Sequence, residues 1–191
     1  MPGYFRFILL LIFFFAAVPQ IYAADYSGVI SISKKGKPAK VDEYADAVVY
    51  FVPKQAVKAS QLDTETKEMK MEKKRYSPRV LPITVGTKVS FPNFDPILHN
   101  AFSTSTNNNF DLGLYAGGET GAYVFEKQGL VRVYCNVHHA MVAYILVFDS
   151  PYFTKPDNDG KFILEDLPDV AGRLFIWHPR ARLIKEKIDW N

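Results

Sequence analysis

Short apolar runs separated by turn-forming residues recur along most of this chain. Phe, Tyr and Trp make up 15% of the residues, and together with 12 Pro and 11 Gly this composition favours strands and turns over long helices. The runs rich in β-branched and aromatic residues, each expected to form a strand, are 25–33, 47–52, 80–85, 88–91, 123–126, 130–134, 142–148, 161–164 and 173–177. Many short strands separated by turns are typical of a β-sandwich or a barrel, so the sequence predicts an all-β fold.

Length and charge narrow the class of protein further. The chain has 191 residues, of which 48% are apolar, so it can bury the core of one globular domain. Its formal net charge is +3, from 23 Lys and Arg against 20 Asp and Glu, and the charges are scattered. Such a small excess does not indicate a nucleic-acid-binding surface.

The first 23 residues have the features of a secretory signal peptide. Arg6 precedes an unbroken apolar run over 7–18, which is 12 residues long, and small residues follow at Ala23 and Ala24. A membrane anchor is the alternative, but about 20 apolar residues are needed to span a bilayer. We therefore expect cleavage after Ala23 and export to the periplasm, with no membrane span in the mature chain.

Three segments lack a clear strand pattern. Residues 54–75 are rich in charge and contain no Gly or Pro, so we expect a charged surface excursion with at most a helical turn. The polar stretch 103–109 is expected as a loop. The tail from 180 to 191 alternates charged residues with Leu183, Ile184 and Ile188, which favours a short terminal helix.

The strongest functional signal is the segment from Cys135 to Met141. Cys135 is the single cysteine of the chain, so it cannot form an internal disulfide. Cys135, His138 and Met141 are spaced three apart in a loop between two expected strands, and His99 follows the expected strand 88–91 in an Asn-rich loop. Two loops at the same end of a sandwich can meet, so the sulfur and nitrogen donors of these four residues can converge.

This donor set points to copper. A thiolate and two imidazoles in a trigonal plane with a weak axial thioether are the ligands of a blue copper site, whereas structural zinc prefers four firm ligands. We therefore expect one type 1 copper site formed by His99, Cys135, His138 and Met141, with one-electron transfer as its chemistry. A catalytic cysteine with His138 as its base is the rival interpretation, but no third orienting group and no oxyanion-hole motif accompany the pair.

Three further features have less specific interpretations. His139 is either a ligand in place of His138 or an exposed residue beside the site. His178 is expected to pack or to form hydrogen bonds at the end of the last strand rather than to bind a metal. The stretch 157–160 resembles the start of a calcium loop, but Pro168 stands where such a loop needs a bidentate Glu, so we expect a turn.

The stretch 76–148 resembles the cupredoxin family. The residues that carry the resemblance are Tyr76-Ser77-Pro78, Ile83, Gly86, Val89-Ser90-Phe91, Asn93, Asp95 and His99-Asn100, followed by Cys135, His138 and Met141. The Cys-x-x-His-x-x-Met spacing is similar to that of amicyanins, which take electrons from methylamine dehydrogenase. The flanks 25–53 and 150–180 resemble a carboxypeptidase-regulatory or transthyretin-like sandwich. The resemblance implies a cupredoxin-like Greek-key β-sandwich flanked by strands of that second kind.

A cupredoxin segment within such flanks resembles the periplasmic L-type proteins of the methylamine-utilisation group. This resemblance implies an accessory role, without enzymatic activity of its own, in building the tryptophan tryptophylquinone cofactor of methylamine dehydrogenase. The implied partner is a redox protein, namely methylamine dehydrogenase, one of its maturation proteins or a cytochrome. The alternatives are an amicyanin-like mobile electron carrier and a non-redox protein-binding module. Related chains often carry histidine where this chain has Arg79, so any extra ligand at that position is missing here.

Overall fold

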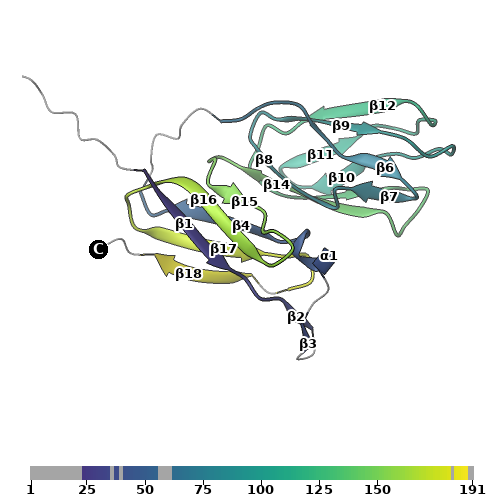
Figure 1. The fold of residues 1–191 in the computed structure, drawn as a ribbon. Coiled ribbons are helices and arrows are strands. Elements are labelled where there is room, and N and C mark those ends of the chain that lie inside the picture. The colour runs from purple at the N-terminus through teal and green to yellow at the C-terminus, as the bar shows by residue number, and fades with distance from the viewer. Residues whose placement is uncertain (1–22, 35–36, 39–40, 56–61, 182, 189–191) are drawn as a thin grey trace, which may run out of the picture.

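The structure of the chain is a computed structural model that describes residues 23–34, 37–38, 41–55, 62–181 and 183–188 (Figure 1). Within these residues the elements are the helix α1 (Val41–Tyr44) and the strands β1 (Ala23–Val29), β2 (Ser33–Lys34), β3 (Lys37–Pro38), β4 (Val48–Pro53), β5 (Lys67–Glu68), β6 (Lys70–Glu72), β7 (Arg75–Ser77), β8 (Val80–Thr84), β9 (Lys88–Pro92), β10 (Phe102–Ser105), β11 (Asn108–Asp111), β12 (Thr120–Val124), β13 (Gly129–Tyr134), β14 (Val142–Phe148), β15 (Phe153–Thr154), β16 (Lys161–Pro168), β17 (Gly172–Trp177) and β18 (Ile184–Ile188). In this described part of the chain, no helix has the length and apolar character that crossing a membrane requires.

The strands from β5 to β14 form one β-sandwich, at the upper right in Figure 1. One sheet has the order β11-β10-β13-β14-β8, and the other has the order β12-β9-β5. Because side chains alternate between the two faces of a strand, every second residue of β13 and β14 reaches the space between the sheets. The buried cluster there includes Val89, Phe91, Val131, Val133, Ala143, Ile145 and Val147.

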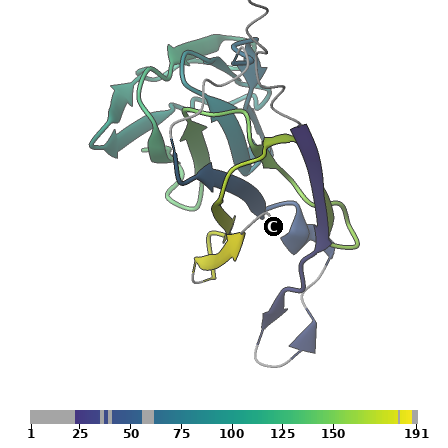
Figure 2. The ribbon, with the colours of Figure 1, turned by 90° about the vertical axis from the view of Figure 1, so that its left-hand side faces the viewer.

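The two ends of the chain form a second sandwich. β4 pairs with β15 and β17, β18 lies at the edge of this sheet, and β1 pairs with β16 in a separate two-stranded sheet. Their buried cluster includes Ile30, Val49, Phe51, Phe162, Leu164, Leu167 and Leu174. Figure 2 shows this second sandwich below the first, with the β2–β3 hairpin projecting from it.

β14 and β4 join the two sandwiches. The face of β14 that is turned away from the first core carries Leu146, which packs with Val48 of β4 and Val80 of β8. Both faces of β14 are therefore covered, which explains why its sequence is an almost continuous apolar run. An ion pair between Arg79 and Asp46, 2.5 Å long, links the same two parts of the chain.

The predicted all-β fold, a sandwich flanked by the strands of a second one, is confirmed. The surface excursion predicted for 54–75 is wrong from β5 onward, because Met69 and Met71 are fully buried in the first core. Their alternation with charged residues is the pattern of strands that are buried on one face only.

Two other local predictions are wrong. The predicted polar loop 103–109 is mostly a hairpin of β10 and β11, in which Ser103 and Asn108 are buried. The predicted terminal helix is the strand β18, which pairs with β17 along its whole length. The predicted signal peptide lies outside the described residues except for Ala23, which begins β1.

Candidate metal centre

The loop between β13 and β14 holds three of the four predicted ligands. Cys135 directly follows β13 and Met141 directly precedes β14, and both side chains are buried. The backbone N–H of Met141 donates to the carbonyl oxygen of His138 at 2.8 Å, which closes a tight turn. This turn brings the sulfur of Cys135 and the ring of His138 to the same side, while His139 stays exposed.

His99 reaches the same place from the loop after β9. Its backbone forms an isolated bridge with Tyr115: the N–H of His99 donates to the Tyr115 carbonyl at 3.2 Å, and the N–H of Tyr115 donates back at 2.9 Å. The imidazole of His99 is fully buried. The bridge fixes the backbone from which this ring projects.

Three donor atoms converge where these loops meet. One atom each from His99, Cys135 and His138 lies within 4.8 Å of the other two. The Cys135 Sγ to His99 Nδ1 distance is 3.7 Å, and the two histidine rings have centroids 4.9 Å apart. Sulfur and nitrogen ligands of one divalent ion in a trigonal plane stand about 3.8 Å apart, given bond lengths of about 2.3 and 2.1 Å. The measured sulfur–nitrogen distance therefore fits a shared metal ion.

His138 offers a free nitrogen to this place. Its Nδ1 atom is buried and has no hydrogen-bond partner in the described part of the chain. Burial lowers the pKa of His138, and the neighbouring His99 and Lys74 lower it further. His138 is therefore held in the neutral form, which is the form that binds metals.

Asp95 orients the ring of His99. Its Oδ2 atom lies 2.8 Å from Nε2 of His99, and the backbone N–H groups of Lys73 and Lys74 donate to the same carboxylate at 2.7 and 2.8 Å. Burial tends to raise the pKa of Asp95, but the hydrogen bonds from Lys74, His99 and Lys73 outweigh it, so this pKa is lowered. An ionised carboxylate keeps the His99 proton on Nε2 and leaves the Nδ1 lone pair facing Cys135.

A second set of hydrogen bonds fixes the two ligand loops to each other. The Asn136 N–H donates to the side-chain oxygen of Asn100 at 2.8 Å, and the Tyr76 hydroxyl donates to the Asn100 carbonyl at 2.7 Å. The same hydroxyl lies 3.1 Å from the Tyr134 carbonyl, next to Cys135. Burial raises the pKa of Tyr76, so its proton stays available for donation.

The remaining candidates lie elsewhere. His178 is buried at the end of β17, where its Nδ1 accepts the Arg180 N–H at 3.2 Å and its Nε2 is 3.5 Å from a carboxylate oxygen of Glu43. Asp157 accepts the backbone N–H groups of Asp159 and Lys161, both at 2.9 Å, so 157–160 is a turn.

The sequence alone assigned no role to Asp95. The feature that could have indicated one is its position, four residues before a candidate histidine ligand.

No protein-family model and no curated protein matches this chain. Among solved structures it is similar to a purple cupredoxin from Nitrosopumilus maritimus, with 28% identity over 43% of this chain and 99% of that one, at a TM-score of 0.39. It is similar to amicyanin from Paracoccus versutus, with 18% identity over 52% of this chain and 97% of that one, at a TM-score of 0.41. It is also similar to a copper-containing nitrite reductase from Thermus scotoductus, with 28% identity over 51% of this chain and a TM-score of 0.42, and it spans only 25% of that enzyme. These likenesses are partial, so the metal centre is interpreted from its own geometry.

Proposed function

We propose that this chain is a type 1 copper protein that transfers single electrons, with His99, Cys135, His138 and Met141 as the metal ligands. The observation that carries the proposal is the convergence of three donor atoms, from His99, Cys135 and His138, within 4.8 Å of one another. In the described part of the chain, Nδ1 of His138 is also buried without a hydrogen-bond partner. Leaving a buried polar atom unpaired costs about 1–3 kcal/mol, so such an atom needs a partner from outside the polypeptide. A metal ion is the partner that the geometry fits.

The donor types favour copper. A thiolate and two imidazoles select a soft or borderline ion, and the thioether of Met141, buried in the same cluster as Cys135, would add the weak sulfur ligand that is typical of a blue copper site. Bound copper supplies the one-electron couple between Cu(II) and Cu(I). The chain supplies the rest: Asp95 directs Nδ1 of His99 toward Cys135, and the surrounding core excludes water.

Electrons have a short route to the surface at His138. His99 and Cys135 are buried, whereas His138 is only half-buried. Apolar residues of the ligand loops are exposed as well, among them Val137 by 44% and Leu98 by 50%. Apolar surface beside a half-buried ligand suits brief contact with a redox partner.

A copper titration with paired histidine variants tests the proposed ligands. We expect Cu(II) to produce an intense thiolate band at one copper per chain, and we expect Cys135→Ser and His138→Ala to remove it. His139→Ala is the matched control, because His139 is exposed and does not belong to the donor cluster. A colourless protein, or a band that disappears in His139→Ala but survives in His138→Ala, contradicts the proposed ligand set.

For the physiological role, we propose electron transfer in the periplasm during formation of the tryptophan tryptophylquinone cofactor of methylamine dehydrogenase. What supports this role is the resemblance of the sequence to the methylamine-utilisation group, together with the N-terminal signal-peptide pattern. Oxidising tryptophan to a quinone removes electrons, which a copper protein can accept. Deleting the gene should leave methylamine dehydrogenase without mature cofactor; full activity after deletion overturns this role.

A mobile electron carrier is the second candidate. The exposed apolar surface beside His138 favours it, since a carrier exchanges electrons with more than one protein. A carrier is expected to exchange electrons rapidly with purified methylamine dehydrogenase that already holds its cofactor. Slow exchange there, combined with a maturation defect after deletion, favours the accessory role.

A further inference from the structure

The β6–β7 hairpin places a group of cations beside the metal centre. Its strands and turn carry Lys70, Lys73, Lys74 and Arg75, which are all exposed, and a single carboxylate, Glu72. We call these four cations the basic rim. The backbone N–H groups of Lys73 and Lys74 donate to Asp95, whose carboxylate lies 2.8 Å from Nε2 of His99. The basic rim therefore lies next to the loop that carries His99.

The hairpin that carries the basic rim is fixed in place. Met71 and Tyr76, one from each strand, are buried in the first core. The turn residues Lys73 and Lys74 have left-handed backbone angles, with φ of 54° and 56°, and both N–H groups point at the carboxylate of Asp95. The cations are thus presented from a rigid support, which is the condition for a selective electrostatic surface.

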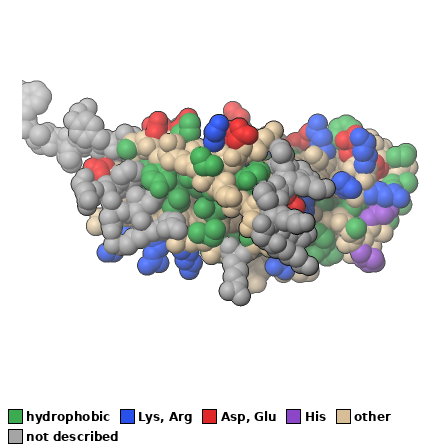
Figure 3. All heavy atoms as spheres, turned by 60° about the horizontal axis from the view of Figure 1, so that its bottom comes forward, with side chains coloured by type: hydrophobic (Ala, Val, Ile, Leu, Met, Phe, Trp, Pro, Cys, Tyr) green, Lys and Arg blue, Asp and Glu red, His purple; other side chains and the backbone are tan. Residues whose placement is uncertain are grey.

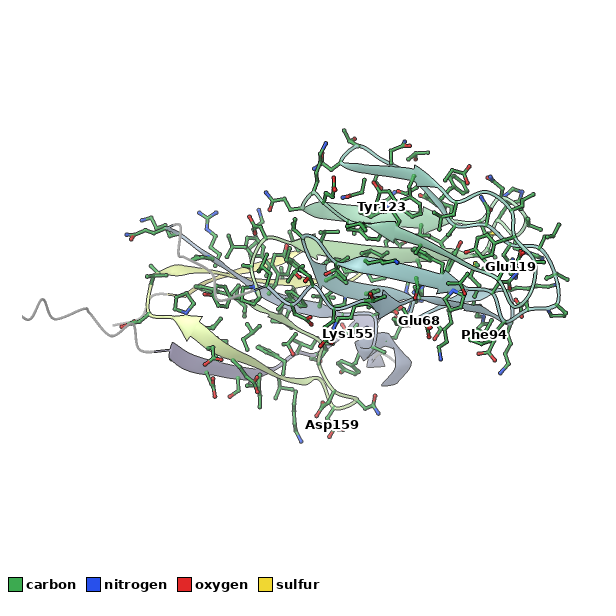
Figure 4. The ribbon with its side chains drawn as sticks, turned by 90° about the horizontal axis from the view of Figure 1, so that it is seen from above. Glu68, Phe94, Glu119, Tyr123, Lys155 and Asp159 are labelled. Atoms are coloured by element: carbon green, nitrogen blue, oxygen red, sulfur yellow. The ribbon has the colours of Figure 1, made fainter. Side chains whose placement is uncertain are left out.

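An exposed aromatic residue of the His99 loop lies against the basic rim. Phe94 is 60% exposed, and the ammonium group of Lys70 lies 5.6 Å from the centre of its ring. The Phe94 N–H donates to the Met71 carbonyl at 2.8 Å, so loop and hairpin are joined. Figure 4 shows Phe94 at the end of the molecule, and Figure 3 shows Lys, Arg and His side chains gathered at one end.

Nearby carboxylates offset part of this positive charge, since Glu68 lies 3.5 Å from the ammonium group of Lys70 and Glu72 is exposed within the hairpin. Asp95 is buried and accepts three hydrogen bonds, so its charge faces inward. Glu119, on the far side of the loop, accepts the backbone N–H of Ala116 at 2.6 Å. With four cations against the exposed carboxylates of Glu68, Glu72 and Glu119, the surface beside Phe94 keeps a positive excess.

We propose that the basic rim and Phe94 form the docking surface for an acidic redox protein, whose carboxylates face Lys70, Lys73, Lys74 and Arg75 while its redox centre approaches His138. This inference rests on the proposed copper function and names the chemistry of the partner. Charge complementarity of this kind steers encounters and raises association rates by about 10- to 1,000-fold at low salt. A partner with a basic surface is repelled at the same place.

Two forms of one cytochrome provide the test. Horse-heart ferrocytochrome c has a basic surface, and succinylation of its lysines makes that surface acidic while the haem stays the same. Each form is mixed with the copper-loaded full chain, and one electron passes from the ferrous haem to the cupric site. We expect the rate constant with the succinylated form to fall as salt is added, and the rate constant with the native form to rise.

Charge-reversal variants locate the effect. At low salt, Lys73→Glu/Lys74→Glu should lower the rate constant with the succinylated form by about tenfold, the low end of the range for electrostatic steering. Lys70→Glu/Arg75→Glu is a second variant, which leaves the turn beside Asp95 unchanged. Lys54→Glu/Lys161→Glu is the control, because it changes the net charge equally at exposed positions of the second sandwich.

Each outcome decides one question. The docking surface is overturned if both rim variants keep the original rate and salt dependence, or if the control variant has the same effect, since net charge alone then accounts for the rates. A protein that binds no copper, or that exchanges electrons with neither cytochrome, overturns the proposed function itself and the docking surface with it. The thiolate band of each variant shows beforehand that its copper site is intact.

Discussion

Replacing Asp95 with asparagine removes one negative charge and one acceptor from the interior without changing the size of the side chain. The carboxylate accepts hydrogen bonds from Nε2 of His99 and from the backbone N–H groups of Lys73 and Lys74, over 2.7 to 2.8 Å. An asparagine amide has one oxygen and one NH₂ group, so at least one of these donors must face another donor. The substitution therefore weakens both the orientation of His99 and the attachment of the hairpin.

The size of the effect follows from the three hydrogen bonds. Hydrogen bonds to a charged group contribute about 1.5–3 kcal/mol each, and the amide keeps part of this, so we expect the free energy of unfolding of the copper-free protein to fall by about 3 kcal/mol. Loss of a partner that orients a ligand histidine usually lowers metal affinity about 10- to 100-fold. The Cu(II) affinity should fall by that factor, while the thiolate band persists because Cys135 is unchanged.

Chelator competition measures the affinity, and urea unfolding of the copper-free protein measures the stability. Asp159→Asn is the control, because Asp159 is an exposed carboxylate of the second sandwich (Figure 4) and makes only a 3.5 Å contact with Lys161 through its side chain. Because the pKa of Asp95 is lowered on folding, its stabilising effect is present above the ordinary value of 3.8 and is lost as the pH falls through the lowered folded-state value. An affinity within threefold of the original protein, or a stability difference that persists in strong acid, refutes this account of Asp95.

Three further substitutions test other parts of the structure. Met141→Leu should keep the thiolate band and lower the free energy of unfolding by less than about 1.5 kcal/mol. It should raise the reduction potential, measured by redox titration, because the weak sulfur donor to Cu(II) is lost. Met71→Ala should lower the free energy of unfolding by about 2–5 kcal/mol, whereas Glu72→Ala beside it should change it by less than about 0.5 kcal/mol; similar values for both contradict the buried hairpin. Arg79→Ala removes the ion-pair partner of Asp46, whose side chain is only 12% exposed. The free energy of unfolding in urea should fall by about 1–3 kcal/mol, and the copper spectrum should not change.

The candidate ligand loop could be predicted from the sequence because its information is local. Cys135, His138 and Met141 lie within one turn between two strands, so their spacing alone brings two of the donor atoms together. His99 could be added because the end of an expected strand places it at the edge of the sandwich. Which nitrogen of each ring faces the cysteine depends on Asp95 and on the packing around His138, and neither is encoded in the spacing.

The wrong predictions share a physical cause. Met69 and Met71 are two apolar residues among many charged ones, so composition favoured a solvated segment although their alternation fits a strand. In the tail, Ile184 and Ile188 have the spacing of a helix face, yet pairing with β17 makes that segment a strand. Short charged segments have weak local preferences, and an available sheet edge decides their conformation.

The hydrogen bonds around the metal centre each join segments that are distant in the chain. The turn of the β6–β7 hairpin holds Asp95, the Tyr76 hydroxyl holds the carbonyl beside His99 and lies close to the one beside Cys135, and the Asn100 side chain holds the ligand loop at Asn136. Because these bonds exist between protein groups alone, the donor atoms are held together independently of the metal. A copper ion bound here, as we propose, would gain or lose an electron with little movement of its ligands. The hairpin that carries the basic rim supplies two of these three supports, its turn and Tyr76, so the surface that we propose for docking and the site that it would serve depend on the same contacts.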